Sequence, residues 1–138
     1  MKGIGLLLLM SILGVNIELA QEVTSKTNQK NSKPAIKFDK TILNLGRIKS
    51  NEKDTYWFKF KNTGKKPLIL TSVMTSCGCM APSWPRAPIK SGKTDSIKVL
   101  YNTQKEGTFF KSIRVYSNAK NSPVILKLKG QVVAKENE

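Results

Sequence analysis

The chain has 138 residues, enough for one domain with a substantial core and too few for two. It contains no histidine, which excludes Ser-His-Asp and Cys-His catalysis and most zinc enzymes. Lysine and arginine total 24 against nine acidic residues, which gives a net charge of +15. Only three of the basic residues are arginine, the side chain that recognises phosphate and guanine through two parallel hydrogen bonds. Composition therefore predicts a basic protein that is not an enzyme and that recognises no specific nucleic acid.

The first segment, residues 1–20, has the features of a secretory signal peptide. Lys2 supplies the positive start, and the apolar run Ile4–Leu13 is too short to span a bilayer comfortably. We expect cleavage after Ala20, which would leave no transmembrane anchor. A lipoprotein would carry a cysteine at the end of the apolar run, and both cysteines lie far downstream. The sequence thus predicts an exported protein, periplasmic or secreted, and not a lipoprotein.

Residues 21–34 are polar and show neither helical nor strand periodicity, as expected of a flexible linker. We expect one folded domain over 35–134 and a short tail over 135–138. Loss of the signal peptide would remove Lys2 and Glu18 together, so the mature protein would keep its full positive charge.

From residue 36 onward, apolar and polar residues alternate with a period of two, which predicts half-buried strands. Tyr56, Phe58 and Phe60 form the clearest example, and we find no comparable helical pattern. The predicted strands are Ile36–Phe38, Ile42–Ile48, Thr55–Lys61, Leu68–Thr75, Ser96–Tyr101, Phe109–Ser117 and Val124–Val132. About seven strands separated by turns rich in Gly, Asn and Pro predict an all-β sandwich.

Residues 81–88 (APSWPRAP) interrupt the pattern, because three prolines remove amide donors and forbid a central strand. This segment is expected to be a stiff loop or an edge. Trp84 within it is a candidate contact for a partner, or else a plug over one end of the sandwich.

The pair Cys77 and Cys79 is the most unusual chemical feature of the sequence. Residues two apart share one face of a strand, and Gly78 between them permits the bend that would bring the sulfurs together. The pair could be a disulfide or two structural thiols, or a thiol site that exchanges with partners. A third hypothesis adds Met74 and Met80 as soft ligands for Cu(I), although both methionines would equally serve as core filler.

Many lysines fall on outward strand positions, where they would keep the protein soluble and protect sheet edges. Members of this group are Lys59, Lys61, Lys98, Lys127 and Lys129. Beyond that role, the charge could support weak, salt-sensitive contact with anionic envelope polymers.

Four segments of the sequence together resemble a bacterial family known only as domain of unknown function 1573. They are NLGRI at 44–48, FKNTGKKPLIL at 60–70, TSCGCMAPSWPRAPIKSGK at 75–93, and IRVYSN…LKLKG between 113 and 130. The resemblance implies an immunoglobulin-like antiparallel sandwich on an exported protein and no enzyme activity. We therefore expect a binding or assembly module that engages an envelope protein, with a thiol-redox or Cu(I) site at Cys77-Gly78-Cys79 as the alternative.

Overall fold

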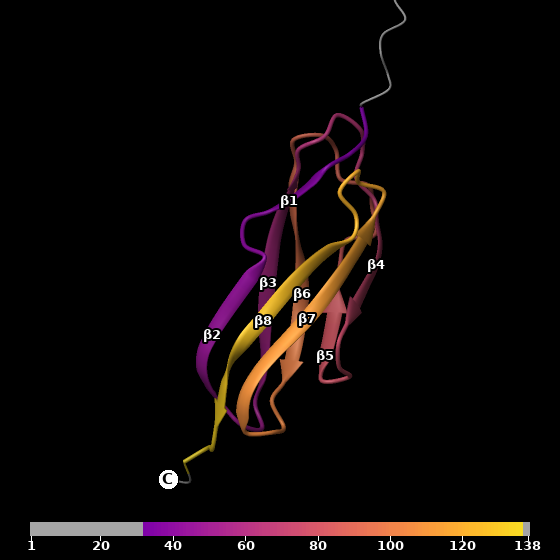
Figure 1. Ribbon diagram of the computed structural model, residues 1–138. Helices are drawn as coiled ribbons and strands as arrows, with labels where there is room; N and C mark the ends of the chain where they lie inside the picture. The colour runs from indigo at the N-terminus through magenta and orange to yellow at the C-terminus, as the bar shows by residue number, and fades with distance from the viewer. Residues whose placement is uncertain (1–31, 137–138) are drawn as a thin grey trace, which may run out of the picture.

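The computed structural model describes residues 32–136, which form eight strands and two sheets. The strands are β1 (Ile36–Phe38), β2 (Ile42–Lys49), β3 (Lys53–Asn62), β4 (Leu70–Thr75), β5 (Met80–Ser83), β6 (Thr94–Asn102), β7 (Gly107–Ser117) and β8 (Val124–Val133). Sheet A has the order β1-β3-β6-β5, and sheet B has the order β2-β8-β7-β4. Figure 1 shows the two sheets stacked as an elongated sandwich. The predicted all-β sandwich is confirmed.

Two details differ from the sequence-based expectation. There are eight strands, because residues 80–83 form the short strand β5. In addition, β2 runs parallel to β8, whereas every other pair in the two sheets is antiparallel. The chain crosses from sheet A to sheet B between β1 and β2. The sequence did not predict the parallel pair, because alternation along a strand identifies its buried face but not its neighbouring strand or their relative direction.

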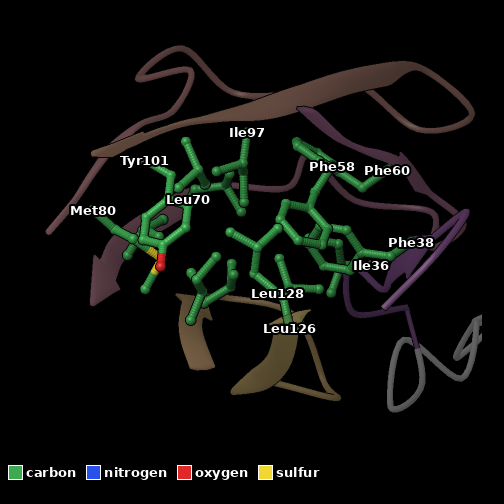
Figure 2. Close-up of a cluster of buried hydrophobic side chains, with 14 of the residues drawn as sticks. Ile36, Phe38, Phe58, Phe60, Leu70, Met80, Ile97, Tyr101, Leu126 and Leu128 are labelled. Carbon is green, nitrogen blue, oxygen red and sulfur yellow. The ribbon is translucent and has the colours of Figure 1, made fainter. Parts of the chain in front are cut away.

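The core lies between the sheets and is built from the apolar positions of the period-two pattern. Phe58 and Phe60 on β3 are 1% exposed, and Leu126 and Leu128 on β8 are fully buried opposite them. Figure 2 shows this packing, with Ile36 and Phe38 at one end of the core and Met80 and Tyr101 at the other. Burial of each such side chain stabilises the fold by about 1.5–3 kcal/mol. A strand turned over would expose these side chains, so the sequence strongly specifies which face of each strand is buried.

Strand β5 lies at the edge of sheet A and pairs only with β6. Pro82 can occupy this strand because one side of an edge strand needs no amide donor. The predicted alternative of an edge for the proline-rich segment 81–88 is thus confirmed for residues 81–83. Strand β4 is shorter than predicted, since Leu68 instead forms an isolated bridge with Ile89.

The crossing from β3 to β4 is organised by Asn62, whose side chain is fully buried. Its Nδ2 donates to the carbonyls of Lys66 at 2.8 Å and Ile89 at 2.9 Å, and its Oδ1 accepts from the amide of Gly64 at 3.0 Å. A Cβ added to Gly64 would lie 2.4 Å from the Lys33 carbonyl oxygen, so only glycine lets the incoming chain pass this close. The polar groups of this crossing are therefore paired within the protein.

The predicted signal peptide and all but the last three residues of the predicted linker lie outside the described residues. Pro34, at the end of that linker, is already buried, and its carbonyl accepts a hydrogen bond from the Lys120 amide at 2.9 Å. Within residues 32–136, the structure has no helix long and apolar enough to cross a bilayer.

Candidate functional site

Cys77 and Cys79 form a disulfide in the turn that carries the chain from β4 in sheet B to β5 in sheet A. Their Cα atoms are 5.3 Å apart, within the range that a disulfide spans without moving the backbone. Both residues are half-buried and pack against the edge of the core. An added Cβ at Gly78 would meet no atom within 4 Å, so the tip of this turn faces open space.

Hydrogen bonds hold the same turn independently of the disulfide. Thr75 Oγ1 donates to the Cys77 carbonyl at 2.9 Å, and the Asn102 amide donates to the Cys79 carbonyl at 2.9 Å. The disulfide closes a loop of only three residues, for which the chain-entropy model gives about 1.6 kcal/mol, compared with about 3 kcal/mol for a loop of 15 residues. Stabilisation is thus a modest part of what this bond can do.

The disulfide forms part of the wall of a cavity of about 400 Å³ between the β4–β5 turn and the β6–β7 loop. The lining side chains that bear on its chemistry are Cys77, Cys79, Tyr101, Lys105, Glu106 and Lys111. Two basic residues therefore line the cavity against one acidic residue. Burial raises the pKa of Tyr101 above its ordinary value, so its hydroxyl stays protonated as a hydrogen-bond donor.

The four sulfurs considered as a Cu(I) set do not share one environment. Met74 points outward from sheet B and is 58% exposed, whereas Met80 is 4% exposed within the core. A closed disulfide also presents no thiolate to a metal. Within residues 32–136, no three His, Cys, Asp or Glu side chains are grouped to hold a metal ion. The copper hypothesis now concerns only the reduced protein.

Trp84 is half-buried and packs against the core just after β5. The guanidinium carbon of Arg86 lies 4.0 Å from the centre of its ring, close enough for a cation–π contact. Its indole Nε1 is buried without a hydrogen-bond partner. Trp84 follows Ser83, which pairs with Lys98 in the middle of β6, so it lies beside the edge of sheet A rather than over one end of the sandwich. Its role as a partner contact stays a prediction.

The outer face of sheet B is a second candidate site, which the reading of the sequence missed. Four of the large apolar side chains that the fold leaves exposed point outward from this sheet: Ile42, Met74, Phe110 and Ile125. Phe110 is the most exposed of them, at 62%, and the Lys127 ammonium lies 4.9 Å from its ring centre. The sequence did carry a signal for this face. Phe110 directly follows Phe109, and neighbouring residues of a strand point to opposite faces, so one of the two must point away from the core.

Basic side chains separate these apolar ones across sheet B. The register places Arg114 between Met74 on β4 and Ile125 on β8, and it places Lys129 opposite Phe110. A hollow of about 530 Å³ at the other end of the face is lined by Arg47, Phe110 and Lys129, among others. The four strands of sheet B contain no Asp or Glu, so the face is amphipathic and positively charged.

One further titratable group responds to its surroundings. Burial, followed by a hydrogen bond of 3.1 Å from its hydroxyl to Asp54, raises the pKa of Tyr56 to about 12. The carboxylates of Asp54 and Asp95 lie near the ends of strands in sheet A. Neither sheet therefore presents a catalytic carboxylate pair among its strands.

Comparison with solved structures identifies the fold. The chain aligns with a protein of unknown function from Porphyromonas gingivalis W83 at 17% identity and a TM-score of 0.64, over 78% of this chain and 51% of that one. It also aligns with the ASH/PapD-like domain 7 of human CEP192 at 9% identity and a TM-score of 0.62, over 77% and 89% of the two chains. The second likeness supports an immunoglobulin-like sandwich.

A third similar structure is the secreted serine protease VesC from Vibrio cholerae, at 14% identity and a TM-score of 0.57. The alignment covers 75% of this chain but only 24% of the protease. Against the first of these structures, too, the chain spans about half of the other protein's length. At such identities the likeness concerns the fold alone.

No curated protein matches the sequence. A family model does, over residues 36–132, and its description is "Protein of unknown function (DUF1573)". The matched range begins with β1 and ends within β8, and it includes the disulfide turn. The chain therefore belongs to the DUF1573 family, as the resemblance of its sequence segments had indicated.

Proposed function

We propose that this protein is a non-enzymatic binding module of the cell envelope, which docks an acidic protein on the outer face of sheet B. The observation that carries the proposal is the composition of that face. Exposed apolar side chains alternate there with arginine and lysine, and the strands supply no acidic residue. Protein interfaces are enriched in aromatic residues, methionine and arginine, and all three occur on this face.

The layout favours a protein over a simple polyanion. Phe110, Met74 and Ile125 offer apolar area that a phosphate or sugar polymer would leave uncovered. Arg114 lies between the last two and can pair with a carboxylate through two parallel bonds. A partner that fits would present acidic residues flanked by apolar ones, and the long-range charge would speed its approach.

The sequence adds two supports to the proposal. The expected signal peptide would place the protein in the periplasm or outside the cell, where an envelope partner is available. The absence of histidine and of a carboxylate pair in the sheets supports a role in binding rather than in catalysis. The cationic face would be retained after cleavage of the signal peptide, because every residue in it lies downstream.

Site-specific photo-crosslinking tests the proposal. A photoreactive phenylalanine analogue at position 110 should capture an acidic protein from envelope extract, whereas the same analogue at position 57 should not. Trp57 is the matched control, since it is 53% exposed on the outer face of sheet A. The captured protein should then be purified and its affinity measured by calorimetry.

With the purified partner, Phe110→Ser and Arg114→Glu should each weaken binding about tenfold or more, equivalent to about 1.4 kcal/mol. Trp57→Ser should leave the affinity unchanged, and rising ionic strength should weaken the wild-type complex. Equal losses from both faces would refute the docking surface. Capture of anionic polymer alone, with no protein adduct, would refute the protein partner.

A further inference from the structure

The disulfide turn combines access with positive charge, in a part of the molecule separate from the proposed docking face. Both cysteines are half-buried rather than sealed in the core, and the cavity beside them is large enough to admit the side chain of another protein. At the tip of the turn, a Cβ added to Gly78 would have no atom within 4 Å, so this side of the turn is open. The cavity therefore leaves room for a nucleophile beside the disulfide while the sandwich stays folded.

Two lysines from a different part of the chain border the same cavity. Lys105 belongs to the β6–β7 loop, and Lys111 belongs to β7. The pairing of β4 with β7 continues into the turn, since the Ser76 amide donates to the Ser112 carbonyl at 3.0 Å. This bond holds Lys111, the residue before Ser112, close to the disulfide turn. Nearby ammonium groups favour the thiolate over the thiol, which makes a cysteine a better leaving group.

The fold does not depend on the disulfide to keep its shape at this point. The hydrogen bonds to the carbonyls of Cys77 and Cys79 fix the turn, and β5 is paired with β6 over its four residues. Opening the bond would therefore leave both strands in place. A disulfide that is accessible, flanked by cations and dispensable for the local backbone has the properties of an exchanging bond rather than of a structural one.

We infer that Cys77–Cys79 is a thiol–disulfide exchange site that oxidises a dithiol protein. This activity goes beyond the proposed docking function and uses none of the residues of the outer face of sheet B. One thiolate of the dithiol attacks a sulfur of the disulfide, and the other cysteine leaves with the electron pair and takes up a proton. A mixed disulfide joins the two proteins at this stage.

The second thiol of the substrate then loses its proton and attacks the mixed disulfide, which releases the remaining cysteine. The substrate gives up two electrons and two protons and becomes a disulfide. Cys77 and Cys79 gain them and become two thiols, so one molecule of the protein oxidises one dithiol. Lys105 and Lys111 act as positioning residues that stabilise the departing thiolate.

Intact-mass kinetics with a defined probe test this inference. The mature protein is mixed with a reduced peptide that contains two cysteines separated by two residues. The protein mass should rise by the mass of two hydrogen atoms, and the peptide mass should fall by the same amount. Lys105→Gln and Lys111→Gln should each slow the exchange roughly threefold or more, because the leaving thiolate loses a positive neighbour.

Lys98→Gln is the matched control, because Lys98 is an exposed lysine on β6 in sheet A, away from the cavity. Its rate should equal that of the wild type. Single Cys77→Ser and Cys79→Ser variants should leave the peptide reduced, because neither can form the disulfide that accepts its two electrons. Circular dichroism of the reduced protein and of every variant should show an intact sandwich, and Lys105 in its exposed loop provides a test that does not disturb packing.

Four results would overturn the inference. The disulfide could stay closed in excess reduced peptide, or open only in denaturant, and either result would make it a structural bond. The rate could also be the same in the wild type and in both cavity-lysine variants, which would remove the assigned role of the cavity. Monothiol reduction by glutathione that outpaces the dithiol peptide would refute a dithiol substrate.

Discussion

The chain enters and leaves β4 by two crossings between the sheets, and the two are held in different ways. At the entrance, Asn62 is fully buried and bonds to the backbone of three residues. At the exit, a disulfide of sequence separation two stands beside an open cavity. Figure 1 shows these crossings at opposite ends of β4.

The difference teaches which of the two crossings carries stability. A buried amide with several partners cannot be removed without leaving other polar groups unpaired, so its loss is costly. The disulfide constrains a three-residue loop that hydrogen bonds already define, so its loss is less costly. The covalent bond is the weaker contributor to folding, which leaves it available for chemistry.

The largest effect is expected from Asn62→Ala. The carbonyl of Lys66 and the amide of Gly64 would lose their partner, and the Ile89 carbonyl would keep only its bond from the Leu68 amide. The free energy of unfolding should therefore fall by about 3 kcal/mol. Urea denaturation with an unchanged m-value would measure this. Asn44→Ala is the control, because Asn44 is exposed and bonds only locally to the Gly46 amide; a similar loss there would contradict the assignment.

A paired glycine substitution compares the crossings directly. Gly64→Ala would place a Cβ 2.4–2.6 Å from the backbone of Lys33 to Ala35, so it should destabilise the protein by about 2 kcal/mol through overpacking. Gly78→Ala meets nothing within 4 Å and should change the melting temperature little. Melting curves of both variants check this pair, and the comparison fails if the order is reversed.

Removing the disulfide should have an intermediate effect. Cys77→Ser with Cys79→Ser should lower the free energy of unfolding by about 1.6 kcal/mol on the chain-entropy estimate. Hydrogen exchange of the Asn102 amide, which donates to the Cys79 carbonyl, should stay slow because the turn persists. A loss as large as that of Asn62→Ala would show that the disulfide is the main support of its crossing.

The smallest effect is expected from Tyr56→Phe, and only at alkaline pH. Tyr56 lies on β3, away from both crossings. The pKa of Tyr56 is raised to about 12, so the folded protein holds this proton more tightly than the unfolded chain. Stability from this group is complete below pH 10 and is lost as the pH rises toward 12. Tyr56→Phe should flatten this decline in alkaline urea titrations, whereas the double serine variant should retain it.

The sequence by itself determined the class of fold and most of the strands. Alternation at Phe58 and Phe60 specified which face of β3 is buried, because a strand places successive side chains on opposite faces. Cys77 and Cys79 stood out as a possible disulfide through their spacing, and the family segments indicated an immunoglobulin-like domain. The signal peptide, the cellular location and the Cu(I) hypothesis stay predictions.

Only the tertiary structure decided which residues meet. The parallel pairing of β2 with β8 depends on a change of sheet that no local pattern encodes. Lys105 and Lys111 reach the disulfide cavity because β7 lies beside β4, although they are 26 or more residues away along the chain. The exposed apolar side chains on the outer face of sheet B likewise come from four different strands, since a shared face is a property of strand order and register.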